Sequence, residues 1–526
     1  MINDLRFKLP SLLYSAEQTR ALDHYAIEKP GISGLSLMEK AGQACFEVLL
    51  ERWPACKDLA IFCGSGNNAG DGYVIADLAS AAGKTVTIFQ MGSSERLSGD
   101  ALICAQRVGT LPVHNIEHPE DIEKIQQQTG KSDVIVDALL GTGLKGDVSS
   151  LYANVIDIVN QAGKPVLAVD IPSGLSADTG APPACAINAD VTVTFIGLKK
   201  GLLTGQGPSL SGQVYFNDLG VPGSVYETVP STVRREDYAS LSNLLSPRKK
   251  SAHKGRFGHV LIVGGNVGMA GAALMAGMSA MRTGAGMVTI ATRPEHCALI
   301  TSRQPELMVC GVETLSDLQA LLEKATTLVL GPGLGGNTIQ TKTAGSDFTG
   351  TNEESWSQVL FNYLVQQDLP MVLDADGLNL LSRHVPVIRK DNWVLTPHPG
   401  EAGRLLACST RMIESNRFEA VNKIQQIYRG VTVLKGAGTL ISFEKEGEKQ
   451  NYLINAGNPG MATAGMGDVL SGVIGGLLAQ GLDSVEAARL GVAIHGSAAD
   501  VLAEKHGERG LLATDLLPEI RALVNP

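Results

Sequence analysis

Short hydrophobic runs alternate with amphipathic stretches through residues 58–197. The runs are rich in β-branched and aliphatic residues, and the stretches between them repeat hydrophobic positions with the period of a helix. Buried strands that alternate with helices form a parallel sheet with right-handed connections. We therefore predict strands at 58–62, 84–90, 134–139, 165–170 and 191–196, and helices at 71–82, 99–108, 118–129 and 149–162, after a helical stretch at 16–52.

A second alternation of the same kind follows a polar stretch at 223–237, which has no clear hydrophobic period. This stretch predicts a boundary near 225–235, so we expect one domain over 1–228 and a second over 229–526. The segment 337–358 is polar and typical of a surface loop or a helix entry. The second domain is predicted to hold strands within 258–265, 286–292, 326–333, 370–377, 393–401 and 430–441.

Length and composition support two enzyme-like domains. The chain has 526 residues, 44% of them hydrophobic, and 60 glycines that cluster in short turns after hydrophobic runs. Its eight cysteines show no metal-binding spacing, which is typical of reduced thiols in a cytoplasmic protein. The N-terminus lacks the hydrophobic core of a signal peptide, and the apolar run at 469–482 is too short to span a bilayer. We expect a cytoplasmic protein without a membrane partner.

The formal net charge of −10 arises mostly in the first half, where residues 1–230 hold 16 Lys and Arg against 25 Asp and Glu. An acidic surface repels a phosphate backbone. The charge therefore disfavours nucleic acid as a main partner.

The stretch CGSGNNAGDG, residues 63–72, joins a predicted strand to a predicted helix. Gly64, Gly66 and Ala69 form a G-x-G-x-x-A pattern, one step from the dinucleotide fingerprint, and such a turn offers backbone N–H groups to a phosphate. The next strand, however, ends in Gln90 rather than in an acid that could bind ribose, and Asp71 lies within the glycine-rich segment. An ordinary redox cofactor site is therefore disfavoured.

Polar residues follow three further predicted strands of this half. Asp137 precedes a glycine turn at 141–146, Asp170 is followed by Pro172-Ser173-Gly174, and Lys199 follows the last strand. Each Asp alone is as readily explained as a helix or turn cap. Because the carboxyl ends of parallel strands meet at one edge of the sheet, their convergence favours a ligand site.

The motifs LMEKAG, GSGNNAGDG, DALLGTGL, DIPSGLSADTG and FIGLKKGL together resemble the YjeF N-terminal domain, the NAD(P)H-hydrate epimerase family, over residues 10–220. This resemblance implies a Rossmann-like three-layer sandwich that interconverts the R and S forms of NADHX and NADPHX, nicotinamide nucleotides hydrated at C6. It implies Asp170 and Lys199 as catalytic residues and one potassium ion on Asn68, Asp137 and Ser173. It also implies that two loops bind the substrate: Asn67, Asn68, Ala69, Gly70 and Asp71; and Gly141, Thr142, Gly143, Leu144, Lys145, Gly146 and Asp147.

The strongest motif in the second half is GNPGMATAGMGDVLSGVIGG, residues 457–476. Glycines before a helix expose N–H groups to an anion, and Asp468 beside them can act as a base toward a substrate hydroxyl. The alternative, a helix capped by Asp468, leaves the glycines unexplained. The strand-turn-strand KGAGTLI at 435–441 suits nucleotide phosphates, and His398 between two prolines is expected to face the same side.

These motifs resemble the ribokinase-like superfamily, and within it the YjeF C-terminal domain, the NAD(P)H-hydrate dehydratase family, over residues 240–520. The resemblance implies phosphorylation of the 6-hydroxyl by ADP, with Mg²⁺, and loss of phosphate to give NAD(P)H, AMP and phosphate. It implies Asp468 as the catalytic residue. It places the substrate on Ala272, Gly333, Leu334 and His398, and the nucleotide on Lys435, Gly436, Ala437, Gly438, Thr439 and Gly467.

Two alternatives remain open from the residues alone. The chain could be a vitamin-type kinase with a passenger first domain, or the first domain could be a non-catalytic scaffold or RNA-binding module. The consecutive reactions implied for the two halves favour a bifunctional enzyme. No residue distinguishes ADP from ATP on physical grounds, so that choice rests on family analogy, as does the expected homo-oligomer.

Overall fold

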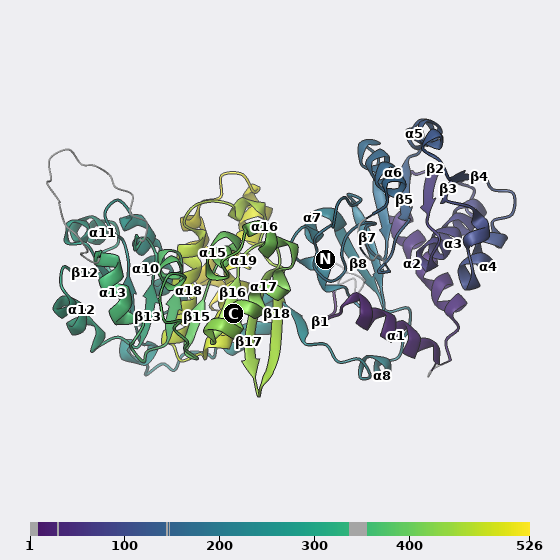
Figure 1. Cartoon of the computed structure of the whole chain (residues 1–526). Helices are drawn as coiled ribbons and strands as arrows, with labels where there is room; N and C mark the ends of the chain where they lie inside the picture. The colour runs from purple at the N-terminus through teal and green to yellow at the C-terminus, as the bar shows by residue number, and fades with distance from the viewer. Residues whose placement is uncertain (1–8, 29–30, 144–145, 147, 336–354, 526) are drawn as a thin grey trace. The chain divides into compact units, whose positions relative to one another are not determined.

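The computed structural model describes residues 9–525 except 29–30, 144–145, 147 and 336–354. The chain divides into two compact units, Met1–Arg235 and Glu236–Pro526, which are considered separately below. Each unit contains a mainly parallel sheet with helices on both faces (Figure 1). The predicted α/β class, with two parallel sheets, is confirmed.

The sheet of the first unit is parallel throughout. Its strand order is β4-β3-β2-β5-β6-β7-β8, so the chain runs outward in opposite directions from β2 and β5. Loops leaving the carboxyl ends of these two strands diverge and open a crevice between them. The strands are β2 (Asp58–Cys63), β3 (Thr85–Met91), β4 (Val113–Ile116), β5 (Val134–Ala138), β6 (Val166–Val169), β7 (Val191–Phe195) and β8 (Gln213–Asn217).

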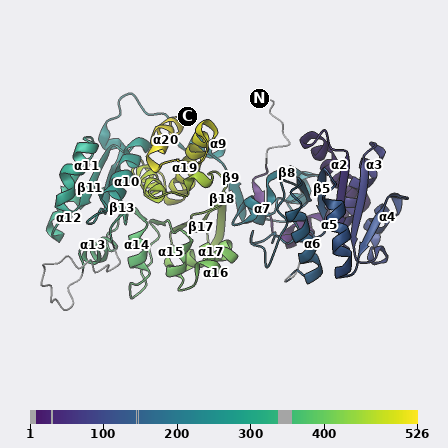
Figure 2. The same cartoon turned by 90° about the horizontal axis from the view of Figure 1, so that it is seen from above.

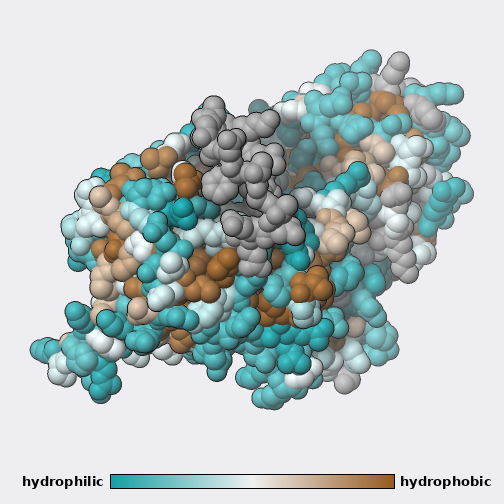
Figure 3. Space-filling model, turned by 60° about the vertical axis from the view of Figure 1, so that its left-hand side comes forward, coloured by the Kyte–Doolittle hydropathy of each residue, from teal (hydrophilic) through white to brown (hydrophobic). Residues whose placement is uncertain are grey.

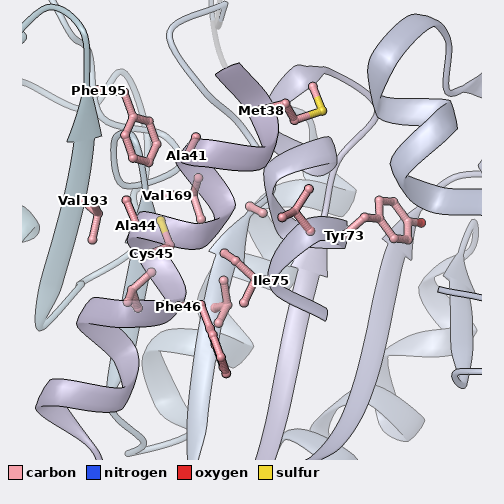
Figure 4. Packing of buried hydrophobic residues seen from close by; sticks show 14 of the residues in the cluster. Met38, Ala41, Ala44, Cys45, Phe46, Tyr73, Ile75, Val169, Val193 and Phe195 are labelled. Atoms are coloured by element: carbon pink, nitrogen blue, oxygen red, sulfur yellow. The ribbon is translucent and has the colours of Figure 1, made fainter. Parts of the chain in front are cut away.

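Helices cover both faces of this sheet and complete the predicted three layers. One hydrophobic core lies under α1, α2, α3 and α4, and another under α5 and α6. Figure 4 shows Ala41 and Ala44 of α2 beside Val169 and Val193 of the sheet, where small side chains let the helix approach closely. The helices are α1 (Ala16–Glu28), α2 (Gly34–Arg52), α3 (Asn67–Ala81), α4 (Gly99–Arg107), α5 (Ile122–Thr129), α6 (Ser150–Gln161) and α7 (Gly207–Ser211).

The structure differs from the sequence prediction at several elements of this unit. The predicted helical stretch 16–52 consists of two helices, α1 and α2, whereas β4 and β8 were not predicted. The polar stretch 223–237 is partly regular, since it contains α8 (Gly223–Tyr226) and β9 (Val233–Glu236), and β9 pairs antiparallel with β1 (Leu12–Leu13). Such short elements take their stability from distant pairing, which a local hydrophobic pattern does not reveal.

The sheet of the second unit runs in the order β18-β17-β16-β15-β14-β13-β10-β11-β12. Neighbours from β16 to β12 are parallel, whereas β16, β17 and β18 pair antiparallel as a meander. The predicted strands are present, and β12 and β18 were not predicted. The strands are β10 (His259–Val263), β11 (Met287–Thr292), β12 (Met308–Gly311), β13 (Thr327–Leu330), β14 (Met371–Leu373), β15 (Trp393–Leu395), β16 (Val431–Leu434), β17 (Thr439–Lys445) and β18 (Glu448–Ile454).

Two groups of helices cover the faces of the second sheet (Figure 2). On one face, α10, α18, α19 and α20 enclose the largest hydrophobic core of the unit. The helices are α9 (Tyr238–Leu241), α10 (Ala270–Thr283), α11 (Cys297–Arg303), α12 (Leu315–Leu322), α13 (Trp356–Leu364), α14 (Asp376–Leu381), α15 (Pro399–Leu405), α16 (Thr410–Ser415), α17 (Arg417–Tyr428), α18 (Met466–Ala479), α19 (Ser484–His506) and α20 (Leu516–Leu523). The predicted segment 337–358 lies mostly outside the described residues.

The surface is mainly hydrophilic on the face shown in Figure 3, where hydrophobic residues occur in small groups. A search of the described residues found no helix with the length and hydrophobicity needed to cross a membrane.

Helix α18 depends on a glycine to pack against α10. A Cβ atom on Gly472 would lie 2.1 Å from the carbonyl oxygen of Ala276 and from the hydroxyl of Ser279. We predict that Gly472→Ala lowers the unfolding free energy by about 1–3 kcal/mol through overpacking. Gly271→Ala in α10 is the matched control, because a Cβ there meets no atom within 4 Å. Thermal unfolding of both variants tests this, and equal melting temperatures would contradict it.

Candidate active sites

The glycine turn after β2 is held by backbone contacts and by a buried glutamine. A Cβ on Gly64 would lie 1.8 Å from the carbonyl oxygen of Leu139, so only glycine allows this approach to the chain after β5. Gln90 is fully buried and donates from Nε2 to the carbonyl oxygen of Gly64 at 2.6 Å, and it accepts from the hydroxyl of Tyr73 at 2.7 Å. Gln90 therefore stabilises the glycine turn. In a redox enzyme, an acidic residue at the end of this strand would bind ribose instead.

Residues 67–71 form the first turns of α3 rather than the loop we predicted. The N-cap is Gly66, which has no side chain to cap the helix, and the helix dipole makes this end favourable for an anion. The helix begins early because glycine at the N-cap and the asparagines after it tolerate a helix start, a local preference that the hydrophobic pattern does not register. Side-chain exposure differs along this turn: Asn67 is exposed, whereas Asn68, Ala69 and Gly70 are buried.

Asp137 and Ser173 are buried together beside this turn. The Ser173 hydroxyl donates to one carboxylate oxygen of Asp137 at 2.5 Å, and its backbone N–H donates to the other at 2.8 Å. Burial raises the pKa of Asp137 to about 6, against the effect of these hydrogen bonds. Asn68 lies next to Gly141, and its buried Nδ2 atom has no hydrogen-bond partner. The three predicted potassium ligands thus lie around the crevice between β2 and β5.

Asp170 and Lys199 form a buried ion pair at the ends of β6 and β7. The Lys199 ammonium donates to Asp170, and also to the Thr194 hydroxyl and the Phe195 carbonyl oxygen, both at 3.1 Å. Lys199 is 1% exposed and Asp170 is 16% exposed, so the carboxylate is the member of the pair that a ligand can reach. The backbone of Asp170 has a φ of 68°, a conformation that costs energy for a residue with a Cβ and that is found mostly at functional sites.

Two other carboxylates interact electrostatically with this pair. Burial and the neighbouring negative charges of Asp170 and Asp23 raise the pKa of Asp71 well above its usual range. Burial also raises the pKa of Asp23 to about 6, which the charge of Lys199 counteracts. Asp23 was not predicted, because it belongs to helix α1, far from the glycine motifs. Its helical periodicity gave no signal of a position near Lys199.

Helix α1 reaches the same edge of the sheet through two contacts. The Arg20 guanidinium donates to the carbonyl oxygen of Thr142 at 3.1 Å, and Thr19 lies against Gly197. The helix therefore bridges the glycine turn after β5 and the loop before Lys199. Of the predicted second loop, Gly141, Thr142, Gly143 and Gly146 are described, whereas Leu144, Lys145 and Asp147 lie outside the described residues.

The second site is built on the N-terminus of α18. Gly465 is the N-cap with a φ of 94°, and no side chain caps the helix, so the alternative in which Asp468 is the cap is wrong. Asp468 lies within the first turn instead. Burial, together with the negative charge of Asp374, raises its pKa to about 7. Such a carboxylate can accept a proton near neutral pH.

Lys435 links the phosphate turn to two strand ends. Its ammonium pairs with Asp374 at 2.7 Å and lies 3.8 Å from Glu401. Burial lowers the pKa of Lys435, but the charges of Asp374 and Glu401 outweigh this and raise it. The Ser471 hydroxyl donates to Asp374 at 2.6 Å and to the carbonyl oxygen of Gly467 at 2.9 Å, so Asp374 joins Lys435 to the first turns of α18.

His398 caps α15 rather than facing the site freely. Its Nδ1 accepts from the Gly400 N–H at 3.0 Å, and its backbone N–H donates to Glu401 at 2.8 Å. Burial and the charge of Lys435 lower the pKa of His398 to about 4, so the ring is neutral at pH 7. The other ring nitrogen lies 3.4 Å from Glu401, and the side chain is half exposed. His398 is therefore a neutral helix cap with a half-exposed side chain.

The predicted substrate residues Ala272 and Gly333 are neighbours in space. A Cβ on Gly333 would lie 3.0 Å from Cβ of Ala272 and 2.8 Å from Met269. Leu334 is fully buried, and its carbonyl oxygen accepts from Ser357 at 2.6 Å, so its side chain supports the turn. On the nucleotide side, a Cβ on Gly467 would lie 3.3 Å from the Lys435 ammonium, which places the helix start beside the phosphate turn.

Three residues of this network, Asp374, Glu401 and Ser471, were not among the predicted site residues. Asp374 directly follows strand β14, and its pairing with Lys435 spans 61 positions, so no local pattern indicates it. A cavity of about 400 Å³ lies next to the chain that leads into α18, and it is lined by residues 459–460, 462–463 and 508–512. Among the described residues, no group of three His, Cys, Asp or Glu side chains is placed to bind a metal ion.

Comparison with known proteins assigns the chain to a family. Residues 34–201 match the family model of the YjeF-related protein N-terminus, and residues 260–522 match that of NAD(P)H-hydrate dehydratase. The chain is 46% identical to the bifunctional NAD(P)H-hydrate repair enzyme of Coxiella burnetii, over 98% of this chain and all of that protein. The chain belongs to this family of bifunctional NAD(P)H-hydrate repair enzymes. The corresponding Escherichia coli enzyme is 41% identical over 98% of this chain and 95% of its own length.

Solved structures similar to about half of the chain include the following two. A ribokinase-like superfamily protein of Enterococcus faecalis is 26% identical, with a TM-score of 0.48, over 56% of this chain and 95% of its own. An ADP/ATP-dependent NAD(P)H-hydrate dehydratase of Bacillus subtilis, crystallised with ATP and Mg²⁺, is 28% identical with a TM-score of 0.46. The match covers 54% of this chain and 95% of that protein.

Membership of the family confirms the bifunctional activity predicted from the sequence. The enzyme is an NAD(P)HX epimerase and an NAD(P)HX dehydratase, and it repairs hydrated nicotinamide nucleotides. The alternatives of a vitamin-type kinase and of a non-catalytic first domain are not supported.

Proposed function

We propose that residues 1–228 carry the epimerase and residues 229–526 the dehydratase, each at the site described above. In the first site, Asp170 moves a proton at the C6 centre while hydroxide leaves and returns, and Lys199 holds the carboxylate in place. The observation that carries this assignment is the Asp170–Lys199 pair, in which a buried lysine with three partners orients a strained, partly exposed aspartate.

The substrate phosphates lie on the N-terminus of α3 and the glycine turn after β5. Uncapped N–H groups at a helix start attract anions, and the turn contributes further backbone donors. Asn67, Asn68, Ala69, Gly70 and Asp71 form the first surface, and residues 141–147 the second. The Arg20 contact with Thr142 supports the position of the second turn.

One potassium ion fits among Asn68, Asp137 and Ser173. The site supplies an amide, a carboxylate and a hydroxyl, which are the oxygen donors that hard cations prefer. The buried Asn68 Nδ2 atom without a partner supports this, because an exchange of the amide nitrogen and oxygen would turn an acceptor toward the pocket. The ion would supply positive charge beside the substrate phosphates.

In the dehydratase site, Asp468 accepts the proton of the substrate 6-hydroxyl. The hydroxyl oxygen then bonds to the β-phosphorus of ADP, and the bond to the bridging oxygen breaks to release AMP. Loss of the C5 proton and of phosphate from C6 restores the double bond of NAD(P)H. Phosphate is a far better leaving group than hydroxide, which accounts for the use of a kinase-like site.

The nucleotide is bound by Lys435, Gly436, Ala437, Gly438, Thr439 and Gly467. The hydrated nicotinamide is bound by Ala272, the Gly333–Leu334 turn and His398. The Lys435 ammonium beside the start of α18 supports this placement, because both attract phosphate. Mg²⁺ would be held through the ADP phosphates and would neutralise their charge, since the described residues offer no cluster of three ligands of their own. The cytoplasmic location and the homo-oligomer stay predictions.

The two activities separate by mutation. We predict that Asp170→Ala slows use of R-NADHX at least about a hundredfold and leaves dehydration of S-NADHX intact, and that Asp468→Ala slows dehydration by a similar factor and leaves R-to-S epimerisation intact. Recovery of reduced-nicotinamide absorbance from each epimer, corrected for spontaneous epimerisation, measures use of R-NADHX and dehydration of S-NADHX, and chromatography of the two epimers without ADP measures epimerisation. Asp157→Ala, an exposed position on α6, is the control. Wild-type use of R-NADHX by Asp170→Ala, or wild-type dehydration by Asp468→Ala, would contradict the assignment.

Potassium dependence is expected for epimerisation. Exchange of KCl for choline chloride at constant ionic strength should slow R-to-S conversion, followed by chromatography without ADP, and added K⁺ should restore it. Asn68→Ala should raise the K⁺ concentration needed for half-maximal rate. Asn115→Ala on the exposed strand β4 serves as the control. A rate independent of K⁺ in the wild type would rule out the ion site.

The pH dependence of dehydration should report Asp468. Only the carboxylate accepts a proton, so the rate with S-NADHX should rise with pH through about 7. Because the charge of Glu401 contributes to the raised pKa of Asp468, Glu401→Gln should move this limb to lower pH. Glu323→Gln makes the same charge change at an exposed position and should leave the limb in place. An unshifted limb in Glu401→Gln would contradict the role of Asp468.

A further inference from the structure

An arginine is buried behind the phosphate turn of the second unit. Arg417 is the first residue of α17 and is 1% exposed, which is rare for a side chain that stays charged. Its Nη1 donates to Glu414 at 3.0 Å. Neither the motifs in the sequence nor the proposed reaction gave it a role.

The guanidinium is bonded to the chain just where β16 passes into the phosphate turn. Nη2 donates to the carbonyl oxygen of Lys435 at 3.1 Å and to that of Leu434 at 3.3 Å. In a trans peptide the C=O and the following N–H point in opposite directions. Because Arg417 holds the Lys435 carbonyl, the Gly436 N–H points away from Arg417, on the other side of the chain.

Gly436 is pressed against the same guanidinium. Its φ is 136°, and a Cβ there would lie 2.8 Å from Nη1 and 2.9 Å from Nη2. The contact explains why glycine follows Lys435, since any side chain would displace the arginine. The contact between Arg417 and Gly436 thus fixes both the position of the turn and the orientation of its peptides.

The arginine also places a positive charge under the turn. Burial lowers the pKa of Arg417, while Glu414 counteracts this, and an arginine remains protonated at neutral pH. In the low dielectric of the interior its field is weakly screened, so it favours an anion bound on the turn.

We propose that Arg417 is a positioning residue for the bound nucleoside diphosphate. Arg417 holds the Lys435–Gly436 peptide so that the Gly436 N–H donates to a phosphate oxygen. The proposal rests on the proposed function, in which residues 435–439 bind ADP. Arg417 itself contacts no substrate.

The experiment measures ADP binding in the full chain. Arg417→Met removes the charge at similar length, and Arg417→Lys keeps the charge but lacks the second guanidinium nitrogen, so it cannot hold Glu414 and both carbonyls in the same planar geometry. We expect the KM and the Kd for ADP to rise about tenfold or more in Arg417→Met, since bonds to charged groups contribute that much. Arg417→Lys should show a smaller rise. In both, the KM for S-NADHX and the epimerase rate should equal those of the wild type.

Two further variants separate the possible outcomes. Lys423→Met removes one positive charge from an exposed position of the same helix and should leave ADP binding unchanged. Lys435→Met should weaken ADP binding whatever Arg417 does. Wild-type ADP binding in both Arg417 variants, or equal rises of KM for ADP and S-NADHX, would overturn the positioning role. Wild-type ADP binding in Lys435→Met would instead overturn the nucleotide placement. If Arg417→Met does not fold, Arg417→Lys decides.

Discussion

Parallel pairing of strands places every carboxyl end at one edge of a sheet, and both active sites depend on this constraint. In the first unit the order reverses at β2 and β5, so their loops separate and leave a crevice that the turn at Gly64 enters. In the second unit the ends of β14, β15 and β16 bring Asp374, His398 and Lys435 together. Residues tens of positions apart meet because the sheet edge is common to them.

A buried lysine paired with an aspartate organises each site. Lys199 is held by Asp170, Thr194 and Phe195, and Lys435 by Asp374 and Glu401. A buried charge is tolerated only when its partners compensate for lost hydration, so these groups have little freedom to move. Burial first, and then the neighbouring negative charges, raise the pKa values of Asp71 at the first site and Asp468 at the second. Charge balance at both sites is therefore sensitive to a bound phosphate.

Much of this arrangement could be predicted from the chain. Hydrophobic runs within 58–62 and 326–333 form strands β2 and β13, because a run buried on both faces has few other stable conformations. The glycine motifs and the strand-end residues Asp137, Asp170 and Lys435 lie where parallel topology requires. Short edge strands such as β4 were missed, since their stability comes from a neighbour. The start of α3 at Asn67 was also missed, because helix caps carry no hydrophobic period.

The sequence by itself determined the two α/β sheets, the glycine turns, and the residue types at the strand ends, because hydrophobic period and local backbone preference act over a few positions. Only the tertiary structure decided which charges meet. Asp23 reaches the Asp170–Lys199 pair from helix α1, and Arg417 reaches the turn at Gly436 from helix α17. Such contacts depend on how a helix packs across a sheet edge, and no local pattern records which of its faces will meet a distant loop.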